Sequence, residues 1–198
     1  SAPGAPATRF TISAADRLAA GRLLEAAGIA ARPGAPRRYA LLHPGASSPV
    51  KRWPAERWAI VADRLAEGGT PVLLAAGPGE ADELAAIERL AARAHHHLPG
   101  APSLGELGAL LAGASLALGA DSAPMHLATA VGTPTLRLFG PGDEALFGPW
   151  GDPTRHRSVR AAGTAPDPSW FGRGDRTHPT LLALSPEAVM AELASLRP

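Results

Sequence analysis

The strongest constraint on the fold is a regular alternation of short apolar runs with amphipathic segments. Apolar runs of the kind that form buried parallel strands occupy residues 39–42, 72–75, 116–119 and 135–139, and two more polar stretches, 96–98 and 157–160, are further candidate strands. Segments with helical periodicity separate most of them, at residues 54–66, 80–94, 103–111 and 123–131. This order is typical of right-handed βαβ units. It predicts an α/β fold with a Rossmann-like parallel sheet and helices on both faces.

Local signals place the ends of several predicted helices. Ser13-x-x-Asp16 and Ser103-x-x-Glu106 read as capping boxes, at the start of helices 13–27 and 103–111. Gly68-Gly69 ends helix 54–66, and Ser185-Pro186 opens a closing helix after a loop-rich stretch at residues 140–179.

Apolar side chains at helical spacing define the faces that we expect to be buried. The expected inward residues of helix 54–66 are Trp58, Val61, Ala62 and Leu65, and those of helix 80–94 are Leu84, Ile87 and Leu90. In the closing helix they are Val189, Met190, Leu193 and Leu196. With 198 residues and 45% hydrophobic residues, the chain is long and apolar enough for one globular domain. We expect residues 1–36 to be a lead-in and a helix packed on that domain, and residues 37–198 to be the domain itself.

Composition excludes several classes of function. The 19 basic and 18 acidic residues balance, so nothing favours nucleic acid or an anionic membrane. The chain has no cysteine, which excludes disulfides and thiolate metal sites. No apolar run is long enough to span a membrane, and residues 1–10 lack the pattern of a signal peptide.

Polar clusters follow three of the predicted strands. They stand at residues 43–51, 77–80 and 119–126. Ligands of open parallel sheets bind at the carboxyl ends of the strands. The three clusters are therefore expected to meet on one rim of the sheet.

The first cluster, HPGASSPVK, has the chemistry of an anion site. Gly45 lets backbone amides approach a phosphate closely, Ser47 and Ser48 add hydroxyl donors, and Lys51 adds a positive charge. It is not a P-loop, because the G-x-x-x-x-G-K-[ST] pattern is missing. A polar turn with a solvated Lys51 is the equally weighted alternative.

The third cluster, GADSAPMH, predicts a second anion site. Asp121 or Ser122 can cap the helix that follows, and its free amides favour an anion. His126 lies four residues after Ser122, so both can face one ligand. The alternatives are a capped helix with a core histidine, and a Ser-His-Asp hydrolase, which the absence of a G-x-S-x-G elbow disfavours.

Three further features have two interpretations each. Glu80 either accepts hydrogen bonds from a ribose or caps its helix. The run from His95 to His97 invites a metal, but consecutive strand residues point to opposite faces, so a metal is disfavoured. The late aromatic residues Trp150, Trp170 and Phe171 either line a ligand pocket or pin a loop to the core.

The ordered set of clusters resembles glycosyltransferase family 9, the bacterial heptosyltransferases of lipopolysaccharide core assembly. The resemblance covers residues 39–149. It rests on the HPG stretch from His43 to Trp58, the G-x-x-E from Gly77 to Glu80, the stretch from Asp121 to Ala130, and Phe139-Gly140. It implies the GT-B fold, of which this chain would be the C-terminal, donor-binding Rossmann-like half, without the N-terminal half.

The resemblance also implies roles for individual residues. Ser47 and Lys51 would hold the diphosphate, Glu80 the ribose, and Ser122 with neighbouring amides the phosphates, with Asp121 and His126 near the sugar. The full expected donor-binding set is Gly45, Ser47, Ser48, Lys51, Gly77, Glu80, Asp121, Ser122, Ala123 and His126. Lys51, Asp121 and His126 are the expected catalytic residues, the general base is expected in the other half, and no metal or other cofactor is expected. Ala123 stands where the family usually has glycine.

The function implied is an inverting glycosyltransferase with a nucleotide-sugar donor, most readily an ADP-heptose-like one. The acceptor would be a glycan or glycolipid of lipopolysaccharide or a related envelope polymer, reached through the other half. The expected location is the cytoplasm or the cytoplasmic face of the inner membrane, and the chain alone is expected to be inactive. The alternatives are half of a GT-B-like nucleotide-sugar epimerase and a non-catalytic nucleotide-binding module.

Overall fold

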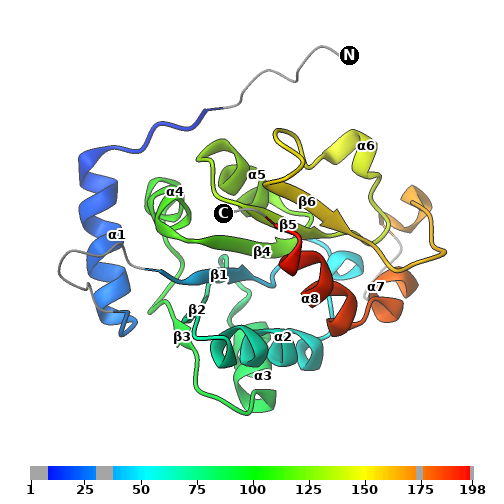
Figure 1. Ribbon diagram of the computed structural model, residues 1–198, viewed down its shortest axis with the longest axis horizontal. Helices are drawn as coiled ribbons and strands as arrows, with labels where there is room; N and C mark the ends of the chain where they lie inside the picture. The colour runs from blue at the N-terminus through cyan, green and yellow to red at the C-terminus, as the bar shows by residue number, and fades with distance from the viewer. Residues whose placement is uncertain (1–8, 30–37, 173–175, 197–198) are drawn as a thin grey trace.

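The fold is an α/β sandwich around one parallel sheet (Figure 1). The computed structural model describes residues 9–29, 38–172 and 176–196. In these residues the sheet has six strands in the order β3-β2-β1-β4-β5-β6, and all pairs are parallel. The strands are β1 (Ala40–His43), β2 (Val72–Leu74), β3 (His96–His97), β4 (Leu116–Ala120), β5 (Thr135–Leu138) and β6 (His156–Val159). The predicted Rossmann-like fold is confirmed.

Helices cover both faces of the sheet, and Figure 1 shows the two layers. One face carries α1 (Ala14–Ala26), α4 (Leu104–Gly113) and α5 (Ala123–Ala130). The other carries α2 (Ala55–Glu67), α3 (Ala81–Leu90) and α8 (Pro186–Ala194). Shorter segments are η1 (Pro49–Lys51), α6 (Glu144–Phe147), η2 (Pro168–Trp170) and α7 (Pro179–Ala183).

Successive side chains along a strand pack alternately into two separate hydrophobic cores, one on each face of the sheet. Leu41 of β1 packs into the core under α1, α4 and α5, whereas its neighbours Ala40 and Leu42 pack under α2, α3 and α8. This is the period of two that a strand imposes, and it explains why the strand reads as a continuous apolar run.

The order of the strands reverses at β1. The chain runs outward from β1 through β2 to β3, then returns to place β4 on the other side of β1, with His43 beside Gly119. The connections after β1 and β4 therefore leave the sheet toward opposite faces. Such a switch point opens a crevice outside the carboxyl ends of the two strands.

The predicted helix signals are confirmed where they are local. Ser13 and Ser103 both form complete capping boxes, with Asp16 and Glu106. The Ser185 hydroxyl accepts a hydrogen bond from Ala188 N at 3.2 Å, which starts α8 as expected. The predicted apolar side of α8 packs against the second core.

Two predictions in the α3 region are wrong. The helix ends at Leu90, four residues before the predicted end, because the Asp63 carboxylate accepts hydrogen bonds from Ala92 N and Arg93 N and turns the chain toward β3. Leu90 was expected to face inward but is 55% exposed, because it lies at this helix end. The stretch 140–179 holds the short elements α6, β6 and η2 and the first residue of α7, but most of its described residues lie outside helices and strands, as expected.

The predicted lead-in is described only in part. Helix α1 packs against α4, as expected for an appended helix. Residues 1–8 and the boundary between residues 36 and 37 lie outside the described residues, so the two-part division stays a prediction. None of the described helices is long and apolar enough to cross a bilayer.

Candidate functional site

A cavity of about 610 Å³ occupies the crevice at the switch point. Its wall is formed by the loops that follow β1, β2 and β4, together with the start of α4 and α6. The polar side chains that line it are His43, Ser47, Lys51, Glu80, Asp121, Ser122 and His126. The apolar lining includes Ala46, Ala76, Pro78, Pro102, Leu104, Leu107 and Phe147. Of the expected donor-binding set, all but Ser48 line this cavity.

Glu80 and Gly45 are packed against each other. A Cβ atom at Gly45 would lie 1.9 Å from Glu80 Oε2, so the carboxylate occupies the space that a side chain would need. Gly77 N donates a hydrogen bond to the same oxygen at 2.7 Å. Glu80 stands at the N-cap position of α3 but makes no side-chain capping bond. Its carboxylate is thus held in the cavity wall by the two glycine-containing loops.

Two buried titratable side chains, His43 and Glu83, interact electrostatically with Glu80. His43 Nε2 lies 3.9 Å from Glu80 Oε2, and burial lowers the pKa of His43 although the carboxylate opposes this. Glu83 Oε2 lies 3.4 Å from Arg52 Nε, yet burial raises the pKa of Glu83 to about 7. Glu83 does not line the cavity itself, but it lies one helical turn after Glu80, which does.

Lys51 and Asp121 form an ion pair across the crevice. Lys51 Nζ lies 2.7 Å from Asp121 Oδ2 and also donates to the Asp121 carbonyl at 3.2 Å. The ammonium also faces the rings of Phe147 and Phe171, at 5.6 and 5.2 Å from their centroids. Lys51 is the single lysine in the sequence, where every other fixed positive side chain is arginine. The alternative of a solvated lysine at this position is therefore wrong, because its side chain is only 19% exposed.

The first turn of α5 is left without a side-chain cap. Ser122 occupies the N-cap position, but its hydroxyl donates to the Ala120 carbonyl at 3.2 Å, and the Asp121 carboxylate turns to Lys51. The expectation that either side chain caps this helix is wrong. A helix start without a side-chain cap offers its amide N–H groups and its partial positive charge to an anion.

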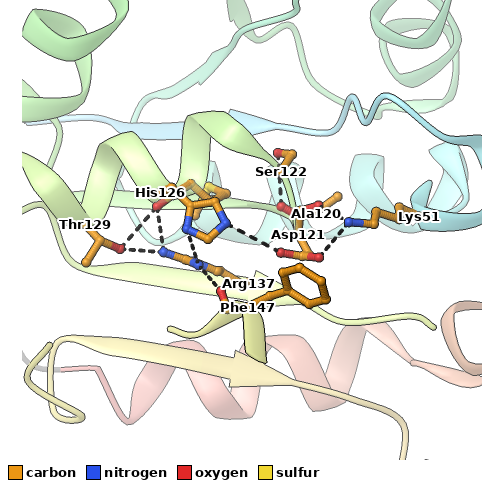
Figure 2. A network of polar contacts seen from close by, with 9 residues as sticks. Lys51, Ala120, Asp121, Ser122, His126, Thr129, Arg137 and Phe147 are labelled. Carbon is orange, nitrogen blue, oxygen red and sulfur yellow. Dashed lines mark hydrogen bonds and ion pairs between the residues drawn. The ribbon is translucent and has the colours of Figure 1, made fainter. Parts of the chain in front are cut away.

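His126 projects from α5 beside Asp121, as Figure 2 shows. Its Nε2 atom lies 3.9 Å from Asp121 Oδ1, and its ring packs against Trp150 at 5.4 Å between centroids. Burial is the main cause that lowers the pKa of His126, and the nearby Arg137 adds to it. These effects favour the neutral imidazole of His126 over the imidazolium.

Arg137 is a site residue that sequence reasoning missed. It lies on β5 beneath His126, is completely buried, and donates to His126 Nδ1 at 3.2 Å (Figure 2). It also donates to the carbonyls of Phe147 and Met125, at 3.1 and 3.0 Å, and to Thr129 Oγ1 at 2.7 Å. Burial lowers the pKa of Arg137 to about 10, which leaves it charged at pH 7. The sequence feature that could have revealed it is an arginine inside an otherwise largely apolar strand, T-L-R-L-F, because a buried charge needs partners.

The late aromatic residues Trp150, Trp170 and Phe171 were expected either to line a ligand pocket or to pin a loop to the core, and they differ in which of the two their contacts support. Trp150 contacts His126, and Phe171 faces Lys51, so both stand against side chains of the cavity. Trp170 instead packs edge-on against His178, with ring centroids 4.8 Å apart.

The run of three histidines does not converge on one point. His95 Nε2 contacts Asp63 Oδ1 at 2.9 Å, His96 Nδ1 contacts the Ala27 carbonyl at 2.7 Å, and His97 Nδ1 contacts Glu88 Oε1 at 2.6 Å. Across residues 9–29, 38–172 and 176–196, no group of three or more His, Cys, Asp or Glu residues is arranged to hold a metal ion.

Comparison with known proteins decides the family. Residues 3–169 match glycosyltransferase family 9 (heptosyltransferase). The chain belongs to this family. It is 38% identical over 116 residues to lipopolysaccharide heptosyltransferase 3 of Escherichia coli K12. The matched region covers 57% of this chain and 33% of that protein. It is 37% identical over 123 residues to lipopolysaccharide heptosyltransferase 1 of Pseudomonas aeruginosa, covering 61% of this chain and 33% of that protein.

Solved structures of this glycosyltransferase family share the fold. A family 9 glycosyltransferase from Veillonella parvula superposes with a TM-score of 0.78 at 23% identity, over 94% of this chain and 53% of that one. The E. coli heptosyltransferase WaaC with ADP gives a TM-score of 0.58 at 25% identity, over 79% and 43% of the two chains. The chain spans about a third of the curated relatives it matches and about half of these solved structures. It is therefore a heptosyltransferase-family domain that corresponds to one half of the GT-B fold.

Proposed function

We propose that this domain is the donor-binding half of an inverting glycosyltransferase that uses an ADP-heptose-like nucleotide sugar. The observation that carries the proposal is the cavity at the switch point, where Lys51, the uncapped start of α5 and Glu80 converge. These groups supply a cation, backbone donors and a carboxylate, which together suit a diphosphate joined to a ribose.

Each part of a nucleotide sugar has a complementary part of the cavity. The diphosphate is assigned to Ser47, Lys51 and the amides at the start of α5, and the ribose hydroxyls to Glu80. The apolar wall at Leu104 and Leu107 is then left for the flat base. The sugar would extend toward Asp121 and His126. Gly45, Gly77 and Ala123 contribute backbone, whereas Ser48 lies outside the lining and is proposed only to shape its loop.

The named relatives support an adenine nucleotide. The E. coli heptosyltransferase WaaC has been solved with ADP and with ADP-2-deoxy-2-fluoro heptose. Ala123 adds a methyl group where the resemblance leads us to expect glycine. Because that methyl restricts how closely a ligand approaches the backbone, we propose that it adjusts the position of the phosphate without preventing binding.

The proposed reaction is a direct displacement. An acceptor hydroxyl attacks the anomeric carbon, the bond from that carbon to the diphosphate oxygen breaks, and the nucleoside diphosphate leaves with the electron pair. Lys51 and the α5 amides stabilise the charge that grows on the diphosphate. We assign the base that takes the hydroxyl proton to the other half of the GT-B fold, which this chain does not match.

The proposed setting is the synthesis of lipopolysaccharide or a related envelope glycan. The acceptor would be a glycan or glycolipid presented by the other half. A cytoplasmic location, at or near the inner face of the inner membrane, is part of the same proposal. No metal or other cofactor is included in the proposed reaction, because Lys51 and the helix start supply the positive charge.

The proposal is tested by titrating ADP, GDP, UDP and their sugars into the 198-residue chain by calorimetry. Adenine nucleotides should bind most tightly, and the purified chain should transfer no sugar to an acceptor. Preferential binding of UDP-sugars would favour the epimerase half, and no binding of any nucleotide would overturn the proposal. Transfer by this chain alone would refute the assignment of the base to the other half.

A further inference from the structure

A buried cation lies directly beneath the histidine of the site. Arg137 is completely shielded from solvent, and its side chain reaches from β5 to His126 on α5 and to the Phe147 carbonyl at the end of α6 (Figure 2). A buried guanidinium is costly unless its N–H groups are paired. The contacts to Met125 and Thr129 fix the other end of the guanidinium. Its orientation toward His126 is thus set by the surrounding fold.

The contact between Arg137 and His126 determines where the imidazole carries its proton. Arginine has five N–H donors and no acceptor, so the bond of 3.2 Å requires His126 Nδ1 to accept. An accepting Nδ1 carries no proton. A neutral imidazole protonates one nitrogen, so the proton must sit on Nε2. A cationic His126 would instead direct an N–H at a guanidinium N–H.

The Nε2 proton points to the ligand side of the site. Nε2 lies 3.9 Å from Asp121 Oδ1, which is too long for a hydrogen bond, and His126 lines the cavity. The charged groups that act on the ring are Arg137 from β5, Lys51 from η1 and Asp121 after β4. Both cations disfavour a charged imidazole, whereas only the carboxylate favours one, and Asp121 already pairs with Lys51.

We propose that Arg137 is a positioning residue that locks His126 as a neutral imidazole with its proton on Nε2. In this state His126 offers the ligand one hydrogen-bond donor, and it acts neither as a cation nor as a proton-accepting base. The part of the ligand that receives this bond rests on the proposed function: it would be an oxygen of the diphosphate or of the sugar. The tautomer itself is a property of the free chain.

The tautomer is measured directly by two-dimensional ¹⁵N NMR of the imidazole rings in the ligand-free chain. The sequence has seven histidines, and the signals lost in His126→Gln identify the ring of interest. At pH 7 and above we expect an unprotonated Nδ1 and a protonated Nε2. A proton on Nδ1, or a cationic ring at pH 7, would overturn the proposal.

Two substitutions of Arg137 separate positioning from simple structural support. Arg137→Met removes the donor and the charge, so the His126 pKa should rise by about one unit and the two tautomers should mix. Arg137→Lys keeps the charge and should shift the pKa less. Thr129→Val is the matched control, because it removes one acceptor of the same guanidinium but leaves the bond to Nδ1. An unchanged His126 pKa and tautomer in folded Arg137 variants would refute the role. If neither variant folds, the wild-type spectrum still tests the proposal, because a proton on Nδ1 is incompatible with a donor at Arg137.

Ligand binding gives a second readout. Glutamine at position 126 places an amide N–H near the site of Nε2, whereas asparagine places one near Nδ1. His126→Gln should therefore bind ADP several-fold more tightly than His126→Asn, although both should bind less tightly than the wild type. The reverse order would count against a donor at Nε2. If the wild type binds no ADP, the proposed function fails, while the NMR result on Arg137 still stands.

Discussion

Lys51 Nζ lies 2.7 Å from Asp121 Oδ2, and this pair joins the loop after β1 to the start of α5 across the crevice. The two residues are 70 positions apart in the sequence. The Asp121 side chain is only 5% exposed, and Lys51 is the positive side chain that pairs with it there. The ammonium thus has two functions: it balances a buried carboxylate and presents N–H donors to the cavity.

Removing the Lys51 charge should weaken nucleotide binding. Lys51→Met retains much of the apolar stem but loses the charge-assisted hydrogen bonds to a phosphate. We expect the affinity for ADP to fall about 10- to 100-fold, or about 1.5–3 kcal/mol. Calorimetry with ADP measures this effect.

A surface arginine provides the control for that experiment. Arg64 pairs with Glu187 on the outer side of α2 and does not line the cavity. Arg64→Met removes the same formal charge and should leave ADP affinity within about twofold, because exposed charges at a distance are screened. Equal affinities for Lys51→Met and the wild type would remove Lys51 from the site.

Substituting Gly45 should affect the site through Glu80. A Cβ atom at position 45 would lie 1.9 Å from Glu80 Oε2 and would therefore displace the Glu80 carboxylate. Because that group is the end of a flexible side chain, Gly45→Ala should cost little stability but should lower ADP affinity about as much as Glu80→Ala does. In the double variant the two losses should not add, because residues in direct contact are coupled.

A helix glycine elsewhere is the matched control. Gly21 of α1 has open space where its Cβ would lie, so Gly21→Ala should leave binding unchanged and should slightly stabilise the helix. Fully additive losses for Gly45→Ala and Glu80→Ala would show that the loop acts on the nucleotide independently of Glu80.

Glu83 should make stability depend on pH near neutrality. Its pKa is raised from 4.5 to about 7 in the folded state, so the folded chain holds a proton that the unfolded chain releases above pH 4.5. The contribution of this bound proton to the free energy of unfolding is fully present below pH 4.5 and is lost as the pH rises through 7. Glu83→Gln cannot titrate, so at pH 8 it should be more stable than the wild type by about 1–2 kcal/mol, allowing for partial solvent access.

Urea denaturation of both chains at pH 5 and pH 8 measures this difference. The advantage of Glu83→Gln should shrink at pH 5, where the wild-type carboxyl is neutral in the folded state. Glu67→Gln is a suitable control, because Glu67 is exposed and pairs with Arg93 at the surface. An advantage of the same size at both pH values would mean that packing, and not titration, distinguishes the two side chains.

Nucleotide binding should not require a divalent metal. The positive charge near the expected phosphates comes from Lys51 and from the start of α5. ADP affinity measured with excess EDTA should therefore equal that measured with Mg²⁺ within about threefold. A strict Mg²⁺ requirement would contradict the assignment of these groups to the diphosphate.

The sequence predicted the fold well, because the signals that define it are local. The strand β1 is a continuous apolar run, and the capping box at Ser103 is complete within four residues. Helix ends that depend on distant partners were harder to place. The early end of α3 requires the carboxylate of Asp63, which lies almost 30 residues before the amides it binds.

The site was predicted only where its residues fall in motifs after strands. Lys51 and Asp121 were found in this way, but their direct pairing depends on the strand order β1-β4, which the periodicity does not fix. Arg137 was missed because its role depends on contacts from α5 and α6 to the middle of a strand. The raised pKa of Glu83 likewise follows from burial, which the helical pattern around it does not reveal.

The reversal of strand order between β1 and β4 has a consequence for how such a domain can diverge. The crevice exists because two neighbouring strands send their chains to opposite faces, and not because of any side chain that lines it. The lining is supplied by loops, whereas the gap itself is supplied by topology. Substitutions such as glycine to alanine at position 123 can therefore alter what the gap accepts without removing the gap. Ligand choice and fold are separable variables in this architecture, and selection can act on one while the other stays constant.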